Sequence, residues 1–182
     1  GVLSIQGDFR KHLDSLQRCG APAREIRTPE DLTHVDRLII PGGESSTVGM
    51  LLERFGLAEA IGERVQAGMP IWGTCMGMIL LAEEVEQRDQ FRLGLLPITV
   101  RRNAFGRQVH SFEIPVEFDG LAEPVLGVFI RAPIVTAWAD SVVVKAKHDG
   151  AVVAVQSGKV LGTSFHPELT ADTRLHEYFL GL

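Results

Sequence analysis

A single cysteine separates a predicted apolar strand from a predicted apolar helix in the stretch Met69-Pro70-Ile71-Trp72-Gly73-Thr74-Cys75-Met76-Gly77-Met78-Ile79-Leu80-Leu81. The pattern Gly-x-Cys-x-Gly is typical of a nucleophile elbow, in which the reactive side chain projects from a strained turn between strand and helix. Gly73 and Gly77 have no Cβ, so they allow this turn to pack closely. The helix that starts at Met76 directs the positive end of its dipole at Cys75 and favours the thiolate. The alternative is a buried, inert cysteine, and a base elsewhere in the chain is needed to decide.

The composition is that of a globular chain with enough length for a sizeable core. Its 182 residues are 45% hydrophobic and 23% charged, which argues against a disordered chain. The formal net charge of −5 gives no basic field of the kind that binds nucleic acid. No apolar run approaches the roughly 18 residues needed to span a bilayer.

Cysteine usage and the N-terminal residues indicate the cellular setting. Two cysteines, Cys19 and Cys75, are too few for a disulfide framework or a cysteine-rich zinc site. The first residues lack the basic and then apolar pattern of a secretory signal. We therefore expect a cytoplasmic protein that binds no metal and no cofactor, and whose partners include neither nucleic acid nor a membrane.

Strand and helix patterns alternate in the first half of the chain. Apolar spacing and turn residues predict strands at 2–6, 23–26 and 35–40, and helices at 9–19, 48–55 and 57–67. This alternation predicts a parallel sheet covered by helices. Functional loops in such sheets lie beyond the carboxyl ends of the strands, where both Cys75 and the loop Pro41-Gly42-Gly43-Glu44-Ser45 fall.

The second half changes to short β runs, predicted at 98–101, 112–116, 125–130, 142–147, 151–156 and 160–164. Asp149-Gly150 and Ser157-Gly158 are hairpin signals between three of them. No linker separates the halves, so we expect one domain over residues 1–182. The predicted fold is a flavodoxin-like three-layer α/β sandwich with a mostly parallel central sheet, an antiparallel extension and a short helix at 173–182.

His166 is the best candidate for the base among six histidines. It precedes Pro167, which biases it toward extended geometry, and in an extended segment Glu168 projects to the same side as His166. Cysteine, imidazole and carboxylate would then form a set of nucleophile, base and orienting group. For an isolated His-Pro-Glu the better interpretation is a solvated turn, but the upstream elbow reverses that preference. His12 and His176 are interpreted as residues on helix surfaces.

Two other segments offer binding groups. The loop Gly42-Gly43-Glu44-Ser45 presents backbone N–H groups before a helix start, which suits an oxyanion. It is not a nucleotide P-loop, because no Gly-Lys-Ser/Thr follows. A structural turn with Ser45 or Ser46 as the helix cap is a compatible alternative. The basic cluster at 101–107 is either a carboxylate site or a solvated loop.

The elbow, the late His-Pro-Glu and the Pro-Gly-Gly after a strand together resemble the triad-type (class I) glutamine amidotransferases. More narrowly, the chain is similar over nearly its whole length to glutaminase subunits of pyridoxal 5′-phosphate synthase. Five segments carry this similarity: Leu3-Ser4-Ile5-Gln6-Gly7-Asp8-Phe9-Arg10, Ile40-Pro41-Gly42-Gly43-Glu44-Ser45-Ser46-Thr47, Arg102-Asn103-Ala104-Phe105-Gly106-Arg107-Gln108, Phe129-Ile130-Arg131-Ala132-Pro133 and Ser164-Phe165-His166-Pro167-Glu168-Leu169-Thr170. The third and fourth are the most specific, since generic amidotransferases lack them.

The resemblance implies a role for individual residues. Cys75 attacks the side-chain carboxamide of glutamine, His166 moves the protons and Glu168 orients His166, through a glutamyl thioester that water hydrolyses to glutamate. The backbone N–H groups of Gly43 and Met76 form the oxyanion hole. The positions that match glutamine-binding residues of the family are Gly43, Glu44, Ser45, Arg102, Ile130 and Arg131, and Gln6 matches a position near the oxyanion site and the partner interface.

The resemblance also implies a partner, a (β/α)8-barrel synthase subunit that takes the ammonia and forms a dodecamer decorated by glutaminase subunits. Docking to the barrel completes the oxyanion hole. Two residues depart from the family pattern: Met76 replaces the usual alanine, and His110 replaces an acidic residue.

Three alternatives stay open. The first is the glutaminase of another pathway, such as that of imidazole glycerol phosphate synthase. The second is a stand-alone γ-glutamyl cysteine hydrolase, and the third is a regulatory binding subunit with a vestigial triad. The Arg102-to-Gln108 segment argues against the first two. The intact Cys75, His166 and Glu168 argue against the third.

Overall fold

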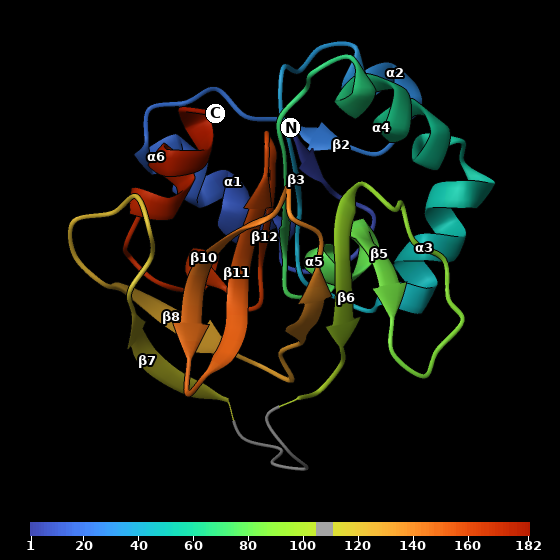
Figure 1. Ribbon diagram of the computed structural model, residues 1–182. Helices are drawn as coiled ribbons and strands as arrows, with labels where there is room; N and C mark the ends of the chain where they lie inside the picture. The colour runs from blue at the N-terminus through green and yellow to red at the C-terminus, as the bar shows by residue number, and fades with distance from the viewer. Residues whose placement is uncertain (105–110) are drawn as a thin grey trace.

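A mixed sheet forms the centre of the molecule in the computed structural model, which describes residues 1–104 and 111–182 (Figure 1). Within these residues the sheet has ten strands in the order β2-β1-β3-β4-β12-β11-β9-β6-β5, with β10 paired to β11. Its strands are β1 (Val2–Leu3), β2 (Glu25–Ile26), β3 (Leu38–Ile40), β4 (Ile71–Thr74), β5 (Ala82–Val85), β6 (Leu96–Arg101), β9 (Ile134–Trp138), β10 (Val143–His148), β11 (Ala151–Ser157) and β12 (Val160–Thr163). A separate antiparallel pair consists of β7 (Phe112–Val116) and β8 (Val125–Phe129).

The parallel part of the sheet contains the strands on which the elbow is built. Strand β1 pairs with β2 and β3, β3 pairs with β4, and β4 pairs with β12, all in parallel. Beyond β12 the pairing becomes antiparallel through β11, β9 and β6, while β5 pairs with β6 in parallel. The hairpins predicted at Asp149-Gly150 and Ser157-Gly158 join β10 to β11 and β11 to β12. The predicted parallel sheet with an antiparallel extension is therefore confirmed.

Helices cover both faces of the sheet and enclose two hydrophobic cores. They are α1 (Phe9–Arg18), α2 (Pro29–Leu32), α3 (Ser45–Arg54), α4 (Leu57–Gln66), α5 (Met76–Leu81) and α6 (Arg174–Leu180), with a 3-10 turn, η1, at Pro167–Leu169. Figure 1 shows α1 and α6 together on one side and α2, α3 and α4 on the other. Successive residues of β4 point to opposite faces, so Ile71 joins the core under α3 and α4 and Trp72 joins the core under α1 and α6. The predicted three-layer α/β architecture is confirmed.

Two strands were not predicted from the sequence. Strand β5 follows α5 directly, and the continuous apolar run of 78–82 has no period that separates helix from strand. Ala82 leaves the helix in an extended conformation because β5 pairs with β6, a tertiary contact that local propensity does not report. Strand β9 follows Pro133, and no hairpin signal marks it.

None of the helices in the described part of the chain is long and apolar enough to cross a membrane.

Candidate active site

Four neighbouring parallel strands, β1, β3, β4 and β12, end at the same edge of the sheet. The segments that follow them carry Gln6, Gly43, Cys75 and His166, respectively. Residues separated by up to 160 positions in the sequence therefore meet because their strands are adjacent, as expected for a ligand site of an open α/β sheet.

Cys75 occupies the strained backbone conformation that the elbow pattern predicts. Its φ of 49° and ψ of −105° are unusual for a residue with a Cβ. A Cβ on Gly73 would lie 2.4 Å from the backbone of Gly77, and one on Gly77 would lie 2.1 Å from the carbonyl oxygen of Ile40. Both glycines are thus required by close backbone packing. The Cys75 N–H donates to the carbonyl of Thr163 at 2.7 Å, which fixes the elbow to β12.

His166 and Glu168 form a hydrogen-bonded pair just beyond β12. Nδ1 of His166 lies 2.8 Å from Oε1 of Glu168, and both side chains are buried. The backbone between the two residues is not extended as predicted, because Pro167–Leu169 forms the 3-10 turn η1. This turn, with proline at its first position, brings the carboxylate back to the imidazole. The His166 N–H donates to the carbonyl of Val128 at 2.8 Å, which anchors the backbone to β8.

The charges of this pair are set by their neighbours. Burial opposes protonation of His166, but hydrogen bonds and charge interactions with Cys75 and Glu168 outweigh it and raise the pKa of His166 to about 10. Burial also opposes ionisation of Glu168, yet the interactions with His12 and His166 bring its pKa below the usual value. At neutral pH the geometry therefore favours an imidazolium next to a carboxylate. An imidazolium is the form that stabilises a neighbouring thiolate.

A cavity of about 340 Å³ opens at the elbow. Its lining includes Cys75 and His166, the predicted binding residues Gly43, Glu44, Ser45, Arg102, Ile130 and Arg131, the predicted Gln6 and Met76, and two residues that the sequence analysis did not select, Ile79 and Asn103. Asn103 lies in the Arg102-to-Gln108 segment, which carries part of the family resemblance, so the sequence did contain a signal for this residue. Glu168 is not in the lining and contacts His166 from behind.

Glu44 caps helix α3, so the alternative of a Ser45 or Ser46 cap is wrong. Its carboxylate accepts the N–H groups of Ser46 at 3.1 Å and Thr47 at 2.7 Å. These hydrogen bonds, those of Thr47 above all, outweigh burial and lower the pKa of Glu44 to about 2. A glutamate whose two oxygens meet two free helix N–H groups caps as a serine would, and it adds a charge that favours the helix dipole.

A chain of polar contacts links the loop after β3 to Arg102. The Glu44 N–H donates to Oε1 of Gln6 at 3.2 Å. Gln90, which the sequence analysis did not select, donates from its amide to Oγ of Ser45 at 3.2 Å and accepts from Arg102 at 2.8 Å. Arg102 also lies 4.0 Å from the Glu44 carboxylate. Gln90 therefore links Ser45 to Arg102 within the cavity wall.

Ile130 and Arg131 reach the cavity from the loop after β8. The carbonyl of Ile130 lies 3.7 Å from Sγ of Cys75, and Arg131 has a φ of 46°, in the left-handed region. Residues 105–110, which include Phe105, Gly106, Arg107, Gln108 and His110, lie outside the described residues.

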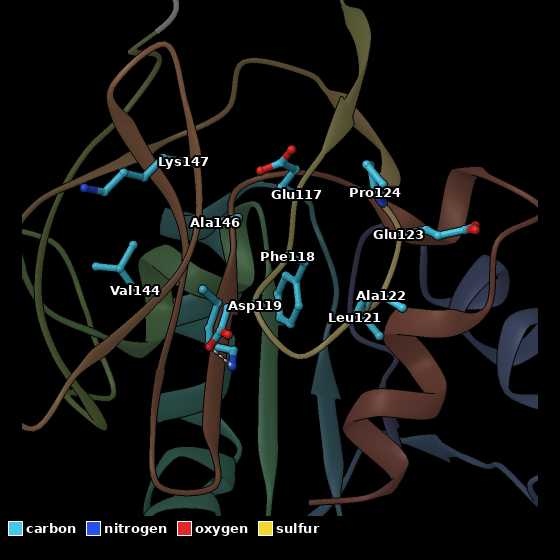
Figure 2. Close-up of a pocket in the computed structure, with 11 residues that line it drawn as sticks. Glu117, Phe118, Asp119, Leu121, Ala122, Glu123, Pro124, Val144, Ala146 and Lys147 are labelled. Atoms are coloured by element: carbon cyan, nitrogen blue, oxygen red, sulfur yellow. Dashed lines mark hydrogen bonds and ion pairs between the residues drawn. The ribbon is translucent and has the colours of Figure 1, made fainter.

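Another cavity, of about 690 Å³, lies over β10 and the turn after β7 (Figure 2). Phe118, Asp119 and Lys145 line it, and Lys145 pairs with Asp119 at 2.7 Å. Its lining contains no cysteine and no histidine. We assign the candidate chemistry to the smaller cavity at the elbow, because that cavity brings the strained Cys75 together with His166. In residues 1–104 and 111–182 no group of three or more histidine, cysteine and acidic side chains is arranged to hold a metal ion.

His12 and His176 are not surface residues, contrary to the interpretation of the sequence. Both are fully buried, and they lie behind Glu168 on the side away from the cavity, with Nε2 of His12 3.4 Å from Oε2 of Glu168. A signal was present in the sequence. His12 lies on the helix face of Phe9, Leu13 and Leu16, and His176 lies next to Leu175 on the buried face of α6.

A strained cysteine elbow and a buried His–Glu pair at the carboxyl edge of a parallel sheet are the arrangement of α/β hydrolytic enzymes that work through a cysteine. The model of the SNO glutamine amidotransferase family matches residues 2–181. The chain belongs to this family, and the predicted glutamine amidotransferase class is confirmed.

Individual relatives agree with this assignment over the full length. The chain is 54% identical to "Pyridoxal 5'-phosphate synthase subunit PdxT" of Herpetosiphon aurantiacus, covering 100% of this chain and 98% of the relative. It is 50% identical to the protein of the same name from Roseiflexus sp., again covering 100% of this chain and 98% of the relative. A crystal structure of a glutamine amidotransferase is 49% identical and superposes with a TM-score of 0.95, covering 100% of this chain and 96% of that one. The resemblance described from the sequence is therefore confirmed.

Proposed function

We propose that this chain is the glutaminase subunit of a pyridoxal 5′-phosphate synthase, which hydrolyses L-glutamine to L-glutamate and ammonia and delivers the ammonia to a synthase subunit. One observation carries the chemistry: the strained Cys75 shares a cavity with His166, whose far nitrogen is held by Glu168. The names of the relatives, subunits of pyridoxal 5′-phosphate synthase, support the pathway.

The proposed reaction begins with attack of the Cys75 thiolate on the carboxamide carbon of glutamine. The C–N bond breaks as protonated His166 gives its proton to the leaving nitrogen, which departs as ammonia and leaves a glutamyl thioester. Neutral His166 then takes a proton from water as the water oxygen attacks the thioester. The S–C bond breaks, glutamate leaves, and the thiolate and the imidazolium are restored.

Glutamine recognition is assigned to the charged residues of the cavity. The guanidinium groups of Arg102 and Arg131 suit the α-carboxylate, because arginine binds carboxylates through paired N–H donors. Glu44 stays ionised over the whole physiological range, since its pKa is about 2, and it suits the α-ammonium group. Ser45 and the backbone near Ile130 complete the proposed binding set.

The oxyanion is assigned to the backbone N–H groups of Gly43 and Met76. The Gly43 loop is fixed in part by Gln6, which accepts from the next N–H in the loop. In the proposal, docking of a (β/α)8-barrel synthase subunit at the cavity rim completes this oxyanion hole, in an assembly with a dodecamer of each subunit. The barrel, the dodecamer, the cytoplasmic location and the single domain over residues 1–182 rest on the resemblance and on the sequence.

The proposal is tested by assaying glutamate release with and without the cognate barrel subunit. We expect a low rate for the isolated chain and at least a tenfold increase with the barrel. The barrel subunit of imidazole glycerol phosphate synthase serves as the control partner and should give no increase. Equal rates with and without the cognate barrel contradict the docking step, and activation by the control partner favours the alternative pathway.

A further inference from the structure

A buried pair of histidines contacts the candidate triad from the side opposite to the cavity. We propose that His12 and His176 are positioning residues for the proposed glutamine hydrolysis: His12 presents an N–H to the Glu168 oxygen that His166 does not use, and His176 fixes the tautomer of His12. This inference rests on the proposed function, which does not itself assign a role to either histidine.

The four side chains form a continuous row of short contacts. Oε1 of Glu168 lies 2.8 Å from Nδ1 of His166, and Oε2 lies 3.4 Å from Nε2 of His12. The opposite nitrogen of His12, Nδ1, lies 3.0 Å from Nε2 of His176. Nε2 of His12 also lies 3.2 Å from Oγ1 of Thr74, the residue before the nucleophile. The row therefore joins the carboxylate to the elbow strand as well as to helices α1 and α6.

One arrangement of protons fits this row better than the opposite one. Nε2 of His12 is hydrogen-bonded to Oγ1 of Thr74 at 3.2 Å, whereas Oε2 of Glu168, 3.4 Å from the same nitrogen, has no hydrogen-bond partner among the described residues. An ionised carboxylate accepts and cannot donate, so a hydrogen on Nε2 of His12 is the tautomer that stabilises Oε2. Neutral His12 then accepts at Nδ1, and His176 donates to it from Nε2. Nδ1 of His176 has no hydrogen-bond partner in residues 1–104 and 111–182, which fits a bare acceptor. The opposite arrangement would bury an unpaired N–H there and aim a lone pair at the carboxylate, both unfavourable.

Burial keeps both histidines neutral, as this arrangement requires. It is the main reason that the pKa of His12 lies below its ordinary value, and burial together with the neighbouring His12 lowers the pKa of His176 to about 3. The ionisable groups that face the row are His166 from the segment after β12, His12 from α1 and His176 from α6. Cys75 influences the charges of this row through His166. Asp8, Arg18 and Asp172 interact electrostatically with the two buried histidines at longer range.

The surrounding rings fix the position of the pair. Trp72 packs edge-on against both histidines, with ring centroids 5.8 Å from His12 and 5.0 Å from His176. The indole N–H of Trp72 donates to Oγ1 of Thr163 at 3.1 Å, so the indole is itself held by β12. A rigid shell of this kind holds an orienting carboxylate within the tolerance that proton transfer needs.

The test compares two substitutions of His12 in the complex with the barrel subunit. His12→Leu keeps the approximate volume and removes the N–H, whereas His12→Gln can place an amide N–H where Nε2 lies. We expect His12→Leu to lower kcat on the order of tenfold, the scale of losing about one hydrogen bond, with KM nearly unchanged. His12→Gln should recover most of kcat. His34→Gln, at an exposed position, is the matched control and should behave as wild type.

The pH profile separates positioning from a purely structural role. Loss of the His12 N–H raises the pKa of Glu168, so the acid limb of kcat/KM moves to higher pH in His12→Leu and returns in His12→Gln. His176→Phe should give the same shift to a smaller extent, and the double variant His12→Leu/His176→Phe should be less impaired than the product of the two single effects. A wild-type kcat and acid limb in folded His12→Leu overturn the proposal. So does equal impairment of the leucine and glutamine variants with no shift of the limb.

A readout without glutamine distinguishes this proposal from the proposed function. The rate at which iodoacetamide alkylates Cys75 depends on the thiolate and its imidazolium partner. The measurement uses a Cys19→Ser background, so that Cys75 is the one remaining thiol. We expect its pH profile to shift in His12→Leu even if glutamine is not the substrate. If His12→Leu does not fold, the same shift is sought in His176→Phe, and its absence there overturns the proposal.

Discussion

Nδ1 of His166 lies 2.8 Å from Oε1 of Glu168, and both groups are buried. Because the other ring nitrogen is then left for the cavity side, the contact fixes both the orientation of the ring and the nitrogen that exchanges protons with substrate. A carboxylate in this place also stabilises the imidazolium that forms when a thiolate is generated.

Glu168→Gln tests this contact with a change of charge at nearly constant volume. The amide can present an N–H to Nδ1 and select the wrong tautomer, so we expect kcat for glutamine hydrolysis to fall by about two to four orders of magnitude, with a small change in KM. The assay uses the complex with the barrel subunit. Full activity in a folded Glu168→Gln complex would mean that Glu168 is only a residue of the η1 turn.

Cys75 combines chemical function with backbone strain, and two substitutions separate them. Cys75→Ala and Cys75→Gly should both abolish glutamate release, whereas Cys19→Ala should keep it. Glycine accepts a φ of 49° more readily than alanine, so we expect Cys75→Gly to be more stable than Cys75→Ala by about 1 kcal/mol, or roughly 2–4 °C in Tm for a chain of this size. Calorimetry checks this order, and a less stable glycine variant contradicts the strain.

Glu44 gives a pH-dependent contribution to stability with a defined sign. Its pKa in the folded chain, about 2, lies below the ordinary value of 4.5. The contribution is therefore fully present above pH 4.5 and is lost as the pH falls toward 2. We expect Glu44→Gln to be less stable than wild type by roughly 0.5–1 kcal/mol at neutral pH, the range for a partly exposed cap. The difference should shrink between pH 4.5 and 2.

Urea unfolding at several pH values measures this difference. Glu53→Gln is the matched control, since Glu53 is exposed on the same helix α3. A difference between Glu44→Gln and wild type that does not change with pH would mean that the cap does not depend on the charge of Glu44.

The fold and the centre of the site were predictable because local patterns carried them. The two glycines around Cys75 indicated a close backbone approach, which the structure contains. The alternation of strand and helix in the first half predicted parallel pairing of the strands. The place where Gly43, Cys75 and His166 meet could be predicted because each of them follows the end of a predicted strand. None of these inferences needed a long-range contact to be known.

The parts that escaped prediction depend on contacts between distant segments. His12 and His176 are 164 positions apart in the sequence, and neither neighbourhood shows that the other is present. Gln90 links Ser45 and Arg102 from an irregular segment without a pattern. Strand β5 exists because β6 is available to pair with it. In each case a tertiary partner, and not local propensity, decides the outcome.

Met76 is the residue of the elbow that departs from the family pattern, and its position predicts the effect of removing it. The side chain is buried and lines the cavity, and its terminal methyl would contact a Cβ on Gly43 at 3.3 Å. Met76→Ala restores the residue usual in the family and keeps the backbone N–H assigned to the oxyanion. We therefore expect kcat within about threefold of wild type, because that N–H remains, and a changed KM, because the cavity widens beside the Gly43 loop.

Stability should fall by about 2 kcal/mol in Met76→Ala, the low end for a buried methionine, since the side chain borders a cavity that already exists. Met78→Ala is the matched control: Met78 is fully buried, lies in the core and does not line the cavity. It should lose more stability, about 3–4 kcal/mol, and leave KM unchanged. If Met76→Ala loses kcat as severely as Cys75→Ala while remaining folded, the methionine side chain supports the oxyanion site directly. The backbone N–H alone would then be an insufficient account of that site.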